Sequence, residues 1–171
     1  ACLSRSRSFI TLDGVLYSCG NNDDNALLRS GKQSLLINTT EYEQFNFKQV
    51  VSGSGFVLLL DNNSDKVVAY GRNDYGQCCQ NNREHLHKIK YISLRESIIK
   101  IACGESHCLA LTKTKAVYSW GKNDIGQLGS GNIGSSTTPY LIEELINKAT
   151  IDIYCSLNDS YALVNKSLYS W

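Results

Sequence analysis

The sequence predicts an all-β fold made of β-propeller blades, each with four antiparallel strands. Two observations lead there: a motif recurs about every 51 residues, and short apolar runs are joined by turn residues. A fixed repeat near this length is typical of arrays, solenoids and propellers. The 171 residues hold only about three to three and a half such units, whereas a closed ring needs at least about four blades. The expected architecture is therefore a partial propeller.

The repeated motif is an apolar run that ends in glycine and is followed by Asn or Asp. It reads VLYSCGNND at 15–23, VVAYGRNDYGQ at 67–77 and AVYSWGKNDIGQLG at 116–129, and a fourth copy, SLYSW at 167–171, is cut off by the end of the chain. The chain is thus one domain, 1–171, with approximate units 1–50, 51–101, 102–152 and a truncated 153–171. Because the last unit stops within a strand, we expect the sequence to be a piece of a longer protein.

Each unit opens with two apolar runs that are too short for helices and rich in Val, Ile, Leu and Tyr. The predicted hairpins pair 9–12 with 15–18, 57–60 with 67–70, 108–111 with 117–120, and 161–164 with 167–171. Their polar connectors suit hairpin loops. The run FVLLL at 56–60 does not alternate, which predicts a strand covered on both faces.

The other strand that can be placed leads into each hairpin, at 47–55, 98–106 and 150–158. After the second strand of the first three units comes a glycine followed by Asn or Asp, which is turn chemistry. The segment 141–149 has some helical character, which is compatible with one helical turn.

The segment 100–131, KIACGESHCLALTKTKAVYSWGKNDIGQLGSG, closely resembles the repeat of the regulator of chromosome condensation. The resemblance spans the whole chain and implies a propeller of seven blades when complete. The second repeat departs from the pattern with Phe56 for the histidine and Cys78–Cys79 for Leu-Gly. The fourth has Ser156 for the glycine and Asp159 for the histidine.

The resemblance also implies a partner-binding face in the turns that precede the histidine strand. The matching positions are Ser54, Gly55, Glu105, Ser106, His107, Asn158 and Asp159. Side chains at strand ends can vary without harming the core, which suits recognition. The competing interpretation is that these are turn residues only, and for His107 a structural hydrogen bond.

Composition narrows the classes of partner. The net charge of +1 gives no basic stripe, so this segment is not expected to bind nucleic acid directly. No stretch approaches 18 apolar residues, so no membrane partner is expected. Seven cysteines with no CxxC and no signal peptide fit reduced thiols and an intracellular location, cytoplasmic or nuclear.

No catalytic constellation stands out, so the chain is not expected to be an enzyme or to hold a metal or another cofactor. His85 and His87 lack a cysteine or aspartate at zinc-ligand spacing. The expected function is a non-enzymatic protein–protein interaction scaffold, part of a propeller in a larger regulatory protein. Two alternatives stay open: nucleotide exchange on a Ran-like small GTPase, and substrate recognition in a HECT-type ubiquitin ligase. Self-association that closes the ring is a further option.

Overall fold

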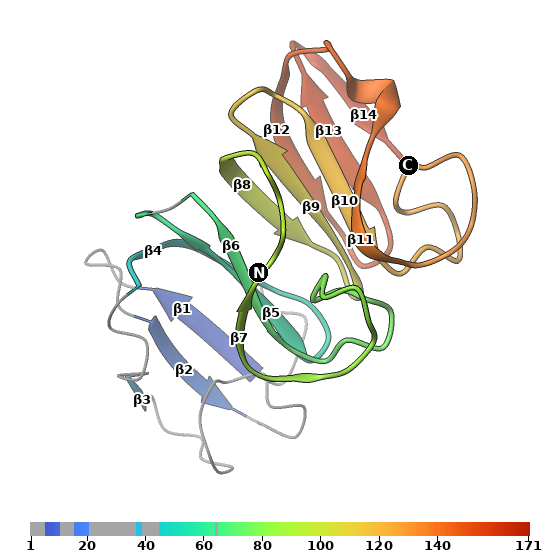
Figure 1. Cartoon of the computed structure of the whole chain (residues 1–171). Helices are drawn as coiled ribbons and strands as arrows, with labels where there is room; N and C mark the ends of the chain where they lie inside the picture. The colour runs from blue at the N-terminus through green and yellow to red at the C-terminus, as the bar shows by residue number, and fades with distance from the viewer. Residues whose placement is uncertain (1–5, 11–15, 21–36, 39–44, 64) are drawn as a thin grey trace.

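A computed structural model describes residues 6–10, 16–20, 37–38, 45–63 and 65–171, with side chains from residue 45 onward. Figure 1 shows the described strands grouped in consecutive antiparallel sheets, coloured from blue to red along the chain. Two of these sheets have four described strands and two have three. The prediction of an all-β partial propeller is confirmed. Among the described residues, no helix has the length and apolar character needed to cross a membrane.

The strands follow the sequence repeat. The first two sheets contain β1 (Ser6–Ile10), β2 (Leu16–Gly20) and β3 (Ile37–Asn38), then β4 (Phe47–Ser52), β5 (Phe56–Asp61), β6 (Val67–Gly71) and β7 (Leu86–Tyr91). The next two contain β8 (Ile98–Cys103), β9 (His107–Thr112), β10 (Val117–Gly121) and β11 (Ser136–Leu141), then β12 (Thr150–Cys155), β13 (Ser160–Val164) and β14 (Ser167–Ser170). The 3-10 helix η2 (Glu143–Leu145) lies in the segment whose sequence has some helical character.

The predicted hairpins are present as β5–β6, β9–β10 and β13–β14, within one residue of their expected bounds. The first hairpin falls partly outside the described residues, and its strand β1 begins three residues earlier than expected. The leading strands β4, β8 and β12 each end three residues earlier than predicted, at Ser52, Cys103 and Cys155. Glycine and serine after these positions form a turn, which ends the ladder.

The two outermost strands of the complete sheets, β7 and β11, could not be located from the sequence. In β7 four of the six residues are exposed, because the strand forms the edge of its sheet. The single proline, Pro139, lies in the edge strand β11. An edge strand tolerates proline because one side of it donates no ladder hydrogen bonds.

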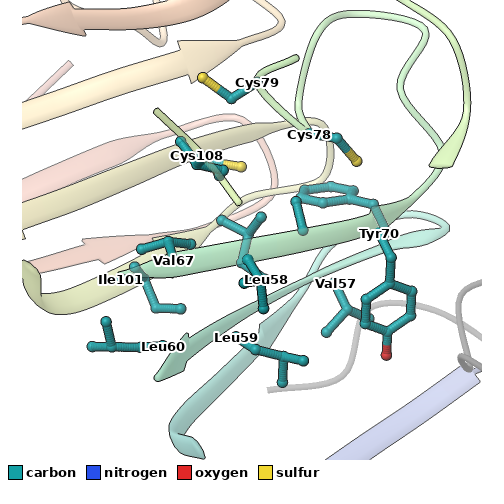
Figure 2. Close-up of a cluster of buried hydrophobic side chains, with 14 of the residues drawn as sticks. Val57, Leu58, Leu59, Leu60, Val67, Tyr70, Cys78, Cys79, Ile101 and Cys108 are labelled. Carbon is teal, nitrogen blue, oxygen red and sulfur yellow. The ribbon is translucent and has the colours of Figure 1, made fainter. Parts of the chain in front are cut away.

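The core lies between sheets. All six residues of β9 are buried, and they divide by parity: Cys108 and Ala110 join one cluster, Leu109 and Leu111 the other. Alternate residues of a strand point to opposite faces, so a strand with sheets on both sides reads as a continuous apolar run. The cluster on the β5 side includes Leu58, Ile101 and Cys108 (Figure 2).

A buried asparagine organises each of the two described loops that follow a repeat glycine, Gly71 and Gly121. Asn123 accepts a hydrogen bond from the Leu128 amide at 3.0 Å and donates to the carbonyls of Asn132 and Gly134 at 3.0 and 3.3 Å. Asn73 makes the equivalent bonds one repeat earlier, with Cys78 as the amide donor. One side chain thus holds both ends of the loop, which explains why Asn recurs there.

Candidate protein-interaction site

The predicted site residues lie in or next to three equivalent turns, between the first and second strand of each sheet. In each turn an amide donates to the carbonyl three residues later: Gly53 to Phe56, Gly104 to His107 and Ser156 to Asp159, at 2.9 to 3.1 Å. We call residues 53–55, 104–106 and 156–159 the turn row. The three turns share this backbone hydrogen bond and differ in their side chains, and their backbones also differ at the third position, where Gly55 has a φ of +77°.

Backbone hydrogen bonds join the turn row across sheets. The Ser54 amide donates to the Glu105 carbonyl at 2.8 Å, and the Glu105 amide donates to the Leu157 carbonyl at 2.7 Å. The leading strands behind them are also neighbours, with β8 in contact with β4 and with β12. Residues about fifty positions apart therefore form one continuous and firmly held edge.

The buried members of the turn row maintain its shape. The carbonyls of Gly55 and Ser106 accept hydrogen bonds from the amides of Arg72 and Lys122, at 2.8 and 2.9 Å. Gly121 approaches the second turn so closely that an added Cβ would lie 2.5 Å from the Ser106 oxygen, and its φ is +100°. Only glycine adopts such a conformation without strain. Gly55 and Ser106 thus contribute mainly backbone to the site.

His107 is 1% exposed and is built into the structure. Its Nε2 lies 3.0 Å from Ser160 Oγ, which donates to the Gln127 carbonyl at 2.8 Å. A Cβ on Gly104 would lie 2.2 Å from the imidazole, so the ring occupies the space that glycine leaves. Burial lowers the pKa of His107 to about 4, although contact with Asp159 opposes the shift. A neutral, enclosed ring fits the structural interpretation of this histidine.

Four of the seven predicted residues present side chains at the surface. Ser54, Glu105 and Asn158 are half-buried, and Asp159 is exposed and accepts a hydrogen bond from Ser156 Oγ at 2.9 Å. The sequence reasoning missed Leu157, which is 52% exposed. The sequence did contain a signal for this residue: the equivalent positions in the two preceding turns hold the polar residues Ser54 and Glu105.

Positive charge lies next to the second turn. Lys122 is paired with Asp124 at 3.1 Å, and its Nζ lies 5.4 Å from the centre of the Tyr75 ring. The pKa of Lys122 is raised, chiefly by its hydrogen bond with Asp124 and to a smaller degree by Glu105. The turn row therefore carries carboxylates, an apolar side chain and a neighbouring ammonium group, a mixed surface suited to a protein partner.

The described residues hold no group of three or more His, Cys, Asp or Glu arranged to bind a metal ion. His85 instead contacts Asp74 at 2.7 Å on an exposed loop, and the same carboxylate pairs with Arg72. The hydrogen bond from His85 and that from Arg72 lower the pKa of Asp74. These contacts tie one segment of the loop to another.

Comparison with known proteins identifies the repeat family. Models of the regulator of chromosome condensation (RCC1) repeat match residues 64–111, 116–163 and 98–127. The chain is 31% identical over 169 residues to the E3 ubiquitin-protein ligase HERC2 of Homo sapiens, covering 95% of this chain and 4% of HERC2.

Two solved structures share the fold. Human WBSCR16 superposes with a TM-score of 0.86 at 22% identity, over 100% of this chain and 46% of that one. Prp20p of Saccharomyces cerevisiae, described with its binding to Gsp1p and histones, gives a TM-score of 0.84 at 22% identity, over 98% and 43% of the two chains. The chain thus spans less than half of each matched structure and a small fraction of the ligase.

Proposed function

Because this chain belongs to the regulator of chromosome condensation repeat family, we propose that it is a non-enzymatic protein-interaction scaffold, part of a propeller in a larger regulatory protein. We place that protein inside the cell, in the cytoplasm or nucleus. One observation carries the proposal: backbone hydrogen bonds hold the three turns of the turn row and join them to one another, but each turn carries a different set of side chains. A rigid frame with variable side chains is the usual form of a recognition surface.

Among specific roles, we favour substrate recognition for a ubiquitin ligase. HERC2 of Homo sapiens is named as an E3 ubiquitin-protein ligase and HERC4 of Homo sapiens as a probable one, and they match this chain at 31% and 34% identity. The chain covers 4% and 12% of these proteins, so on this proposal the ligase chemistry belongs to another part of the protein. The chain itself contributes the surface that selects a protein to be modified.

Nucleotide exchange on a small GTPase is the second candidate. Its support is the likeness to Prp20p, which at 22% identity concerns the fold. Such a role requires binding energy alone, so it uses the same surface as the scaffold role. Release of labelled GDP from a Ran-like GTPase distinguishes them: we expect no acceleration by the full-length protein. Acceleration that is lost on changing Glu105 would replace the ligase proposal with exchange.

The scaffold proposal is tested by reversing charge in the turn row of the full-length protein. We expect the double variant Glu105→Lys/Asp159→Lys to lose a defined set of bound proteins, each by roughly tenfold, which corresponds to about 1.4 kcal/mol of binding free energy. Quantitative mass spectrometry of captured proteins measures the loss. If those proteins are substrates of a ligase, their ubiquitylation falls as well.

A matched control reverses two exposed carboxylates outside the turn row, Glu84→Lys/Glu144→Lys. This control keeps the same change in net charge, and we expect it to alter binding less than twofold. Equal loss in both double variants would show a general charge effect, and unchanged binding in the turn-row variant would contradict the proposed surface.

A further inference from the structure

Two cysteines face each other across the turn that carries Glu105. Cys103 ends β8 and Cys108 is the second residue of β9, and the two are directly opposite in the ladder. Their Sγ atoms are 3.7 Å apart, with the Cys103 thiol placed to donate to the Cys108 sulfur. A disulfide bond needs about 2.05 Å between the sulfurs. Forming the bond therefore requires the two side chains to rotate so that the sulfurs approach by about 1.7 Å.

The position in the ladder favours this bridge. The neighbouring pair, Gly104 and His107, is joined by an amide-to-carbonyl bond of 2.9 Å. Because pair types alternate along an antiparallel ladder, Cys103 and Cys108 form a non-hydrogen-bonded pair, in which the Cα atoms are about 4.5 Å apart. This separation is at the short end of the range that disulfides span, so the bridge would form with strain and be readily reduced.

The two thiols differ in access. Cys103 is partly exposed and lines a hollow of about 190 Å³, together with Cys155 and Tyr154. Cys108 is fully buried, and its Sγ lies 3.6 Å from the Gln77 carbonyl, to which it can donate. Burial raises the pKa of the Cys108 thiol well above its ordinary value. A small oxidant in the hollow therefore reaches Cys103 first.

The equivalent positions in the flanking sheets cannot form such a bridge. The register pairs Ser52 with Val57 in one sheet, and Cys155 with Ser160 in the other. Among the described sheets with this strand pair, two opposed cysteines occur only at Cys103 and Cys108. The bridge would thus act on one turn of the turn row and leave the others unchanged.

We propose that Cys103 and Cys108 form a reversible disulfide bond when the protein meets a hydroperoxide. Cys103 is oxidised to a sulfenic acid, as its sulfur takes the hydroxyl group of the peroxide and one water or alcohol leaves. Cys108 then attacks that sulfur, and its proton leaves with the hydroxyl group as water. Overall two thiols lose two protons and two electrons, and the peroxide is reduced. The bridge closes the turn 104–107 and constrains the Glu105 backbone.

The test uses the full-length protein treated with one equivalent of hydrogen peroxide, then unfolded, alkylated and digested with trypsin. Both cysteines fall in the peptide 101–113, because cleavage follows Lys100 and Lys113. We expect this peptide to lack both alkyl groups and to be lighter than its reduced form by two hydrogen atoms. Dithiothreitol added before alkylation restores both alkylation sites.

Variants identify the pairing. We expect Cys103→Ser to leave Cys108 an alkylatable thiol, and Cys155→Ser to retain the bridge to within about twofold of the wild-type yield. A bridge from Cys103 to Cys155, seen as peptide 101–113 linked to 149–166, would overturn the proposal. So would over-oxidation of Cys103 with Cys108 still reduced, or full alkylation of both. Slow alkylation of Cys108 before unfolding verifies that the tested protein is folded.

Discussion

Replacing Asn123 with alanine tests whether one side chain holds the loop of residues 122–134. The substitution leaves the buried Leu128 amide without its acceptor, a penalty of about 1–3 kcal/mol. The carbonyls of Asn132 and Gly134 belong to exposed residues and regain hydrogen bonds from water, which adds about 0.5 kcal/mol each. We expect Asn123→Ala to lower the free energy of unfolding by about 3 kcal/mol.

The assay is urea-induced unfolding followed by tryptophan fluorescence, since Trp120 is fully buried in the native protein. The control is Asn62→Ala, at an exposed turn position, which we expect to change the free energy of unfolding by less than about 0.5 kcal/mol. A loss below about 1 kcal/mol for Asn123→Ala would refute the reasoning, because it would mean that the Leu128 amide finds another partner.

Three further predictions concern the buried His107, the backbone conformation of Gly121 and the ion pair between Lys100 and Asp152. The folded pKa of His107, about 4, lies below its ordinary 6.5, so only the unfolded chain binds a proton between these values. The contribution of His107 to the free energy of unfolding is therefore fully present above pH 6.5 and falls by about 3 kcal/mol towards pH 4. If the free energy of unfolding of His107→Asn fell equally steeply with pH, this explanation would be contradicted. We expect Gly121→Ala to lower the free energy of unfolding by at least about 2 kcal/mol, because the added Cβ would meet the Ser106 oxygen and the residue has a φ of +100°. Thermal unfolding measures the effect. An unchanged melting temperature would show that the turn shifts freely. The ion pair between Lys100 and Asp152 joins adjacent sheets, and its side chains are 29% and 25% exposed. A double-mutant cycle with alanine should therefore give a coupling free energy of about 0.5–1 kcal/mol that weakens in high salt. Zero coupling at low salt would exclude a stabilising role.

Much of the fold was predictable because its signals are local. The hairpins β9–β10 and β13–β14 were predicted from pairs of apolar runs joined by short polar connectors. In each hairpin the two runs are only a few residues apart in the chain. The continuous run in β5 correctly indicated a strand buried on both faces. The edge strands β7 and β11 escaped detection because an exposed strand carries little apolar pattern.

The candidate site was predictable only in part. The repeat resemblance placed Glu105 and Asp159 in equivalent turns, and both present side chains at the surface. Whether Ser106 and His107 face solvent or the interior depends on neighbouring sheets, since Gly121 and Ser160 lie against them. Leu157 was missed because an apolar leucine is expected to be buried, whereas its place in the turn exposes it.

By itself, the sequence determined the repeat length, the class of fold, the hairpins and the family resemblance, since each rests on residues close together in the chain. The tertiary structure alone decided which groups from different repeats meet. It brought the Ser54 amide to the Glu105 carbonyl, and it assigned alternate residues of β9 to two separate cores. The physical reason is that packing of one sheet on the next sets these contacts, and that packing depends on every sheet at once.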